Sequence, residues 1–327
     1  MAISQAGAYI FRCSSLKKYL EVYQEHYDKL LQTKEIQKED EYGLAVYATW
    51  KLSYDKLGSS AKTLLQMLSC LHHEGITEEI FKRASISFES MDDLDLQIQV
   101  VKLLSDIGKE NSEWNSLVFQ EIIGDIKAYS LIEFDDQNEG YRMHPLVQHW
   151  GAWTLDQQQN NMQKCVLGII GLSIFSYVNH DDYKYQYSLL EHINKCISGF
   201  KPRDINTLIV TNIAYIYYQY GQWKNAEELE IVVMEGKKHT LGEEHPDTLT
   251  SMANLASTYR NQGQWKEAET LEVVVMEKRK HTLGEEHPDT LTCMANLAST
   301  YRNQGQWKEA EALEVVVMEK RKHLLQS

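Results

Sequence analysis

The stretch Glu243–His281, EEHPDTLTSMANLASTYRNQGQWKEAETLEVVVMEKRKH, returns almost unchanged 42 residues later as Glu285–His323. Two of the 39 aligned positions differ: Ser251 is replaced by Cys293, and Thr270 by Ala312. A fixed period of this length is typical of a solenoid, in which each unit buries its apolar side against its neighbours. The surface of such an array usually binds another chain rather than carrying out chemistry.

A weaker third copy precedes these two. Gly221-Gln222-Trp223 lies one period before Gly263-Gln264-Trp265, which in turn lies one period before Gly305-Gln306-Trp307. In the second copy, apolar residues recur at helical spacing over 248–262, Gly263 interrupts them, and another helical run covers 265–281. Each unit is therefore predicted to be a pair of helices, A and B, joined at the Gly-Gln-Trp turn.

This pattern resembles the kinesin-light-chain class of tetratricopeptide repeats. Ala256-x-x-Tyr259 in helix A is followed by Gly-x-Trp-x-x-Ala, and His-Pro-Asp-Thr-Leu opens the second and third units. The resemblance covers about residues 204–325. It implies a mainly α fold that ends in three tetratricopeptide repeats over 205–327, wound as a right-handed superhelix. In that family the A helices line a groove that holds extended peptides.

The resemblance also implies which residues would hold the peptide. An Asn in helix A contacts the ligand backbone in the family, and Asn212, Asn254 and Asn296 match that position; an amide can both donate and accept hydrogen bonds. Arg260 and Arg302 would favour an acidic segment through charge-assisted bonds. The other predicted contacts are Tyr215, Tyr218, Gln219, Thr250, Ser257, Asn261, Thr292, Ser299 and Asn303. The alternative for each is an ordinary solvated polar residue.

Residues 43–150 carry a second pattern. After the opening element Leu52-Ser53-Tyr54-Asp55-x-Leu57 come helical runs, then a predicted strand at 131–134, a polar turn at 135–140 and a second strand from Tyr141. Strand, turn and strand after a helix is typical of a wing. The layout resembles the winged-helix module that follows the nucleotide-binding core in NB-ARC/STAND proteins, which include the NLR-like receptors.

Two further segments extend this second resemblance. Arg142-Met143-His144-Pro145 resembles the Met-His-Asp motif that closes the module, with Pro145 in place of the Asp as in many fungal members. In the family that His reaches the bound nucleotide, so His144 is the nucleotide-sensing candidate if a core is present. Residues 1–42 resemble a helical remnant of that core, and residues 151–204 are predicted to be bridging helices or a degenerate repeat.

Composition limits the partners. The net charge of the 327 residues is −14, with 15 basic and 24 acidic residues in the first 150, so neither part offers the basic surface that nucleic acid requires. The five cysteines are far apart and predict reduced thiols in a cytoplasmic protein. Apolar runs are too short to span a bilayer, so we expect no membrane partner.

The sequence also argues against catalysis. A P-loop needs G-x-x-x-x-G-K-[ST], but the two Gly-Lys pairs, Gly108-Lys109 and Gly236-Lys237, are followed by Glu110 and Lys238. The Glu-Glu-His-Pro turns and the His72-His73 pair match no metal signature. We therefore expect no enzymatic activity, no cofactor and no metal.

These observations predict a non-enzymatic module that binds an extended acidic peptide. The alternative is the sensor and relay half of an NLR-like NTPase, truncated from its nucleotide-binding domain; a third reading is a fragment without a function of its own. Solenoids usually need a polar capping helix, and none follows the third copy. An exposed apolar edge near Val315, Val316 and Met318 is therefore predicted, with self-association or poor solubility.

Overall fold

In this computed structural model, the described residues are 41–87, 94–110, 113–155, 158–174 and 180–324. They form two compact units that divide between Phe200 and Lys201. The helical remnant predicted at 1–42 lies outside the described residues except for its last two positions, which belong to the first described helix.

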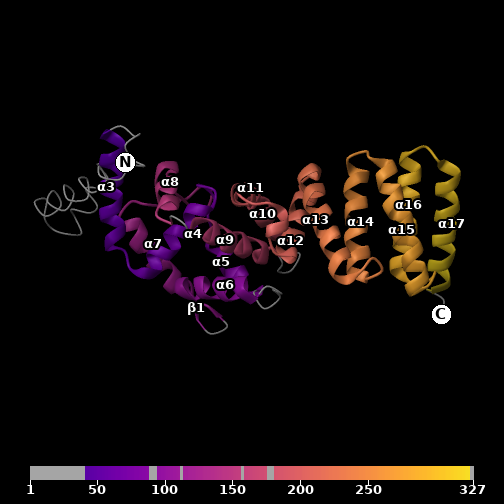
Figure 1. Cartoon of the computed structure of the whole chain (residues 1–327), viewed down its shortest axis with the longest axis horizontal. Coiled ribbons are helices and arrows are strands. Elements are labelled where there is room, and N and C mark those ends of the chain that lie inside the picture. The colour runs from indigo at the N-terminus through magenta and orange to yellow at the C-terminus, as the bar shows by residue number, and fades with distance from the viewer. Residues whose placement is uncertain (1–40, 88–93, 111–112, 156–157, 175–179, 325–327) are drawn as a thin grey trace, which may run out of the picture. The chain divides into compact units, whose positions relative to one another are not determined.

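The first unit is mostly helical (Figure 1). Its described helices are α3 (Glu41–Lys56), α4 (Ser59–Cys70), α5 (Glu78–Ser87), α6 (Leu94–Ile107), α7 (Ser116–Ala128), α8 (Pro145–Trp153), α9 (Gln159–Ser173), α10 (His180–Ser188) and α11 (Leu190–Ile197). Two antiparallel hairpins complete it: β1 (Lys109–Glu110) with β2 (Glu113–Trp114), and β3 (Glu133–Asp135) with β4 (Gly140–Arg142).

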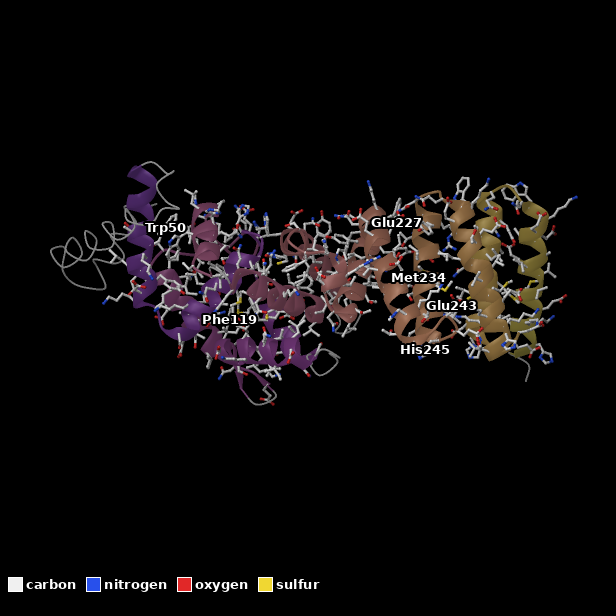
Figure 2. All side chains as sticks on the ribbon, in the orientation of Figure 1. Trp50, Phe119, Glu227, Met234, Glu243 and His245 are labelled. Carbon is white, nitrogen blue, oxygen red and sulfur yellow. The ribbon has the colours of Figure 1, made fainter. Side chains whose placement is uncertain are left out.

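The core of this unit forms around α4, which contacts α6, α7, α8 and α9. Leu64, Leu65 and Leu68 recur at helical spacing on α4 and are completely buried. Trp50 and Phe119, labelled in Figure 2, are also fully buried. Full burial of a large apolar side chain stabilises a fold by roughly 1.5–3 kcal/mol relative to exposure, so these residues anchor the unit.

The strand, turn and strand predicted after residue 130 are confirmed as the hairpin β3–β4. Its register pairs Glu133 with Arg142 and Phe134 with Tyr141. The first strand starts two residues later than predicted, because Leu131 and Ile132 are buried in the core instead. The hairpin β1–β2 was not predicted, since two-residue strands leave no readable alternation in a sequence.

A buried histidine fixes α11 to the segment that follows α4. His192 is 1% exposed; its Nδ1 accepts the His72 N–H at 3.1 Å, and its Nε2 lies 3.1 Å from the Gly75 carbonyl oxygen. Burial lowers the pKa of His192 to about 4, so the ring is neutral at physiological pH, with Nε2–H as the donor. The helix predicted over 183–200 is divided here into α10 and α11.

The second unit is an array of helix pairs. It begins with the short 3₁₀ helix η4 (Pro202–Asp204) and continues as α12 (Thr207–Gln219), α13 (Trp223–Leu241), α14 (Pro246–Asn261), α15 (Trp265–Leu283), α16 (Pro288–Asn303) and α17 (Trp307–Leu324). The helices follow one another in chain order (Figure 1), and α13 and α15 each contact the A helix of the next pair. The prediction of three A–B helix pairs is confirmed.

The two kinds of turn in the array have different causes. Each A–B turn passes through a glycine with φ between 73° and 80° (Gly221, Gly263 and Gly305), a left-handed conformation that disfavours other residues. Each turn from B to the next A ends in His-Pro: His245 Nδ1 accepts the Asp247 N–H at 3.2 Å, and Pro246 occupies the first helical turn. Helix α14 therefore starts at Pro246, two residues before its predicted start.

Candidate functional site

The asparagines predicted to contact a ligand are not equivalent in the structure. Asn254 is exposed and Asn296 is half-buried, whereas Asn212 is 5% exposed and already has an interaction partner. Asn261 and Asn303, at the ends of α14 and α16, are exposed. We call Asn254, Asn261, Asn296 and Asn303 the amide row. Asn212 departs from the prediction, because a buried amide with a partner cannot be offered to a ligand in the same way.

Arg260 differs most from its predicted role. Its Nη1 lies 3.0 Å from Glu272 Oε1 on α15 and donates to the Asn296 carbonyl oxygen on α16 at 3.3 Å. Glu272 is 4% exposed, and its other oxygen accepts the Thr300 hydroxyl at 2.6 Å. The guanidinium is therefore already neutralised inside the contact between the second and third repeats, so it is not the free cation that was predicted to attract an acidic ligand.

Arg302 is the same position one repeat later, and it also has an internal partner. It forms an ion pair with Glu314 on α17, but the two side chains are 52% and 44% exposed. Exposed ion pairs contribute little and exchange easily. Of the two predicted cations, Arg302 is therefore the one that a ligand could recruit.

The remaining predicted contacts lie mostly at accessible positions. Gln219, Thr250 and Thr292 are exposed, and Tyr215, Tyr218, Ser257 and Ser299 are half-buried. Thr250 is partly engaged, because its hydroxyl donates to the Pro246 carbonyl oxygen at 2.9 Å and accepts from Arg279 at 3.0 Å. The structure thus presents a polar, mainly uncharged set of side chains along α14 and α16.

Glutamines that the sequence reasoning did not single out connect adjacent A–B turns. Gln262 donates to Glu227 at 2.9 Å, and Gln304 donates to Glu269 at 2.9 Å and to the Trp265 carbonyl oxygen at 3.0 Å. The signal was available, since Gln and Glu recur at these positions 42 residues apart. Figure 2 shows Glu227 at one end of the array and His245 at the opposite end.

An open hollow of about 360–620 Å³ lies beside each of two array elements near its start. The larger, about 620 Å³, is lined by the first A–B turn with Trp223 and by Asn261, Gln262 and Gln264 of the next turn. Trp223, Trp265 and Trp307 are 37%, 40% and 65% exposed. Asn261 is the predicted ligand contact that this hollow contains. The smaller, about 360 Å³, lies between η4, α12 and α13.

Glutamates at the B-to-A turns are held by lysines of two successive repeats. Glu285 lies 2.7 Å from both Lys280 and Lys320, and these hydrogen bonds lower its pKa to about 2. Glu243 makes the same pair of contacts with Lys238 at 2.5 Å and Lys278 at 3.3 Å. The acidic turns are therefore internally compensated and do not offer a free anionic site.

In the first unit, His144 is the first-turn cap of α8. Its Nδ1 accepts the Leu146 N–H at 3.2 Å, with Pro145 following, which is the same arrangement as His245-Pro246 and His287-Pro288 in the array. His144 also lines a hollow of about 450 Å³ together with His73, Glu133 and Arg142. Its ring therefore has a structural use that does not require a nucleotide.

The described residues narrow the chemistry further. Among them, no group of three or more His, Cys, Asp or Glu side chains is arranged to hold a metal ion. None of the helices described for this chain has the length and apolar character to cross a membrane. The described cysteines, Cys70, Cys165, Cys196 and Cys293, are free and buried.

Comparison with protein families gives two matches. The family described as tetratricopeptide repeat matches residues 209–247, 248–289 and 290–327. A domain of unknown function, DUF7779, matches residues 52–160. The chain is thus a tetratricopeptide-repeat array preceded by a helical module to which no function is attached.

Relatives and solved structures add three similarities. The chain is 30% identical over 270 residues to a nucleotide-binding leucine-rich repeat (NLR)-like protein of Hyaloscypha variabilis (strain UAMH 11265 / GT02V1 / F), covering 77% of this chain and 24% of that protein. It therefore spans about a quarter of that relative. A kinesin-light-chain structure from Podosopora anserina with nearly identical TPR-like repeats has 22% identity and a TM-score of 0.40, covering 55% and 87%. BtubC (BKLC) from P. vanneervenii has 17% identity and a TM-score of 0.41, covering 76% and 92%.

Proposed function

We propose that this chain is a non-enzymatic protein-binding module whose array holds an extended peptide along the amide row. The observation that carries the proposal is the placement of Asn254 and Asn296 on successive A helices of tetratricopeptide repeats. Neither side chain has a hydrogen-bond partner among the described residues. An amide can donate to a carbonyl and accept from an N–H, so it suits a peptide backbone of any sequence.

The charges of the array refine the ligand. Arg260 would have to leave the buried Glu272 to bind an acidic residue, and breaking such a pair is costly. Arg302 would have to leave only the exposed Glu314. We therefore propose that the ligand is bound mainly through its backbone, and that an acidic residue is favoured at one place, opposite Arg302.

The test starts from peptides selected by the wild-type chain from a random twelve-residue display library. Binding of a labelled selected peptide is then measured by fluorescence anisotropy for wild type, for Asn254→Ala with Asn296→Ala, and for Gln137→Ala. Gln137 is an exposed amide on the β3–β4 hairpin and serves as the control. Loss of two hydrogen bonds should weaken binding at least about tenfold, with no change for the control.

Two results would count against the proposal. Undiminished affinity in a double variant with an unchanged circular dichroism spectrum would exclude the amide row, and a library from which no peptide is enriched would exclude an extended ligand. Replacing the acidic residues of a selected peptide by amides tests the charge. The expected loss should be cancelled by Arg302→Gln and unaffected by Arg260→Gln if the latter variant remains folded.

For the first unit we propose a winged-helix module that does not bind nucleic acid. Support comes from the β3–β4 hairpin after α7 and from Ile76, between α4 and α5, which exchanges backbone hydrogen bonds with Tyr141 at 3.1 and 2.7 Å. The acidic balance of the first 150 residues disfavours phosphate contacts. Slow hydrogen exchange at the Ile76 and Tyr141 amides and no gel shift with duplex DNA are the expected results.

A second candidate function is favoured by the NLR-like relative, which the chain matches over about a quarter of its length. In that case the chain would be the sensor and relay part of a cytoplasmic signalling protein, and His144 would sense a nucleotide held elsewhere. Mapping the 5′ end of the transcript tests this. An upstream reading frame with Gly-x-x-x-x-Gly-Lys-Ser/Thr would support it, and a start just before Met1 would contradict it.

A further inference from the structure

Helix α17 carries the face with which the preceding B helix receives the next repeat, and on α17 this face is exposed. On α15, Met276 packs against the cluster of Leu291, Met294 and Val317 on α16 and α17. The equivalent Met318 is 65% exposed. Val315 is 41% exposed, as the sequence predicted, whereas Val316 is half-buried against the same cluster. The exposed apolar edge is thus narrower than predicted and centres on Met318.

The buried glutamate shows the same contrast. Glu272 on α15 is 4% exposed beneath α16, while the side chain of Glu314 on α17 is 44% exposed. Trp307 at the start of α17 is 65% exposed, against 40% for Trp265. The face is therefore built for helix contact in one repeat and uncovered in the next, although the two helices differ in sequence at one position, Thr270 against Ala312.

Charges on this face are ordered along the helix. Glu311 and Glu314 precede Met318 by seven and four residues, and Arg321 and Lys322 follow it by three and four; all four are exposed. Residues separated by three, four or seven positions lie on the same side of a helix. The face is thus acidic toward the N-terminal end, apolar in the middle and basic toward the C-terminal end.

We propose that a second copy of this chain docks on α17, with the two helices antiparallel and Met318 at the twofold axis. Antiparallel pairing puts Glu314 of one copy opposite Lys322 of the other, because each lies four residues from the centre. A twofold interface brings the same patch together from both subunits, so a face whose charges are opposite about its centre is complementary to itself. Met318 and Val315 would supply the apolar contact that α16 supplies to Met276 within the array.

The expected dimer is weak. One helix face buries less than the roughly 800 Å² per partner of a standard interface, so association should depend on concentration. The proposal does not rest on peptide binding, because the amide row lies on the A helices while this face lies on the last B helix.

Sedimentation equilibrium of the full chain tests the proposal. We expect a monomer–dimer equilibrium whose dissociation constant rises about tenfold or more in Met318→Lys, since central apolar contacts dominate interfaces. Leu241→Lys is the matched control, because Leu241 is 45% exposed on α13 and undergoes the same change in charge. A wild-type chain that stays monomeric at its highest soluble concentration, or equal weakening by both variants, would overturn the proposal.

Charge reversal and crosslinking test the orientation. Lys322→Glu should weaken the dimer, and adding Glu314→Lys to the same chain should restore it, because both pairs across the axis then have opposite signs again. Met318→Cys should give an oxidised dimer, while Glu311→Cys should not, with the wild-type chain as the background for the native thiols. Crosslinking of both cysteine variants would indicate parallel helices, and failure of the second charge change to restore association would exclude the pairing.

Discussion

The first and second contacts between repeats are built from nearly the same residues but differ in how they hold a buried carboxylate. Between α15 and α16, Glu272 has Arg260 at 3.0 Å and the Thr300 hydroxyl at 2.6 Å. One period earlier, Glu230 on α13 is 8% exposed, and the position of the arginine is taken by Tyr218. A single substitution in helix A therefore decides whether the buried charge has a counter-charge.

The consequence is visible in the hydrogen bonds and in the pKa. Among the described residues, neither Glu230 Oε2 nor the Thr258 hydroxyl oxygen has a hydrogen-bond partner. Burial raises the pKa of Glu230 to about 7, with the nearby Thr258 hydroxyl opposing the rise and Glu227 adding to it. Burial also raises the pKa of Glu272, while Thr300 and Arg260 oppose it. The comparison teaches that similar repeats can be stabilised in different protonation states.

The strongest way to break the comparison is Arg260→Tyr, which gives the second contact the residue of the first. Glu272 would then be buried without its cation, and removing one partner of a buried pair costs about 3–4 kcal/mol. Urea unfolding of the variant at pH 8 measures the loss. A change below about 1 kcal/mol would mean that Arg260 contributes no more than a surface residue.

The next largest effect is the pH dependence of the first contact. The folded chain holds the Glu230 proton up to about pH 7, whereas the unfolded value is 4.5, so the folded state binds more protons in between. This stabilisation is present below pH 4.5 and is lost as the pH rises through 7. A shift of this size corresponds to about 2–3 kcal/mol.

Glu230→Gln isolates that contribution, because glutamine does not titrate. Relative to wild type, the variant should gain stability between pH 4.5 and 8, and the two should be closest at the acidic end. Urea unfolding at several pH values gives the difference. A difference that does not vary with pH would contradict the raised pKa.

The sequence predicted the parts of this comparison that depend on period and missed those that depend on packing across helices. The 42-residue shift aligns Glu230 with Glu272 and Tyr218 with Arg260 without a structure. Pairing of Arg260 with Glu272 was missed, because the two lie on different helices and their distance follows from the A–B packing. A signal was present: Glu272 stands in an otherwise apolar run, where a charged residue needs a partner.

The functional residues were predicted with the same division. Positions of the amide row follow from the repeat, but burial of Asn212 does not, because the first repeat has a different sequence around it. His144 was assigned to a nucleotide by resemblance, and its helix-capping role could have been inferred from the His-Pro pairs at 245 and 287. The hairpin β3–β4 was predicted because its strands flank a polar turn.

A smaller difference separates the two threonines. Thr300→Ala removes a hydrogen bond to a carboxylate and should cost about 1.5–2 kcal/mol, whereas Thr258→Ala removes a hydroxyl without a hydrogen-bond partner among the described residues. Both lose the same methyl group from a completely buried site, so the difference between the variants isolates the hydrogen bond. Equal losses in urea unfolding at pH 8 would show that the two contacts are alike.

The smallest expected change sharpens the comparison in the opposite direction. Tyr218→Arg supplies the first contact with the cation that it lacks, and at pH 8 it should stabilise the chain by about 1 kcal/mol, because the gain of a counter-charge is partly offset by desolvation of the guanidinium. Below pH 4.5 Glu230 is protonated and the gain should vanish. Combining Tyr218→Arg with Glu230→Gln provides the control, since the arginine then has no carboxylate to neutralise. A gain that persists in this double variant would come from another contact of Arg at 218 and would leave the buried charge unexplained.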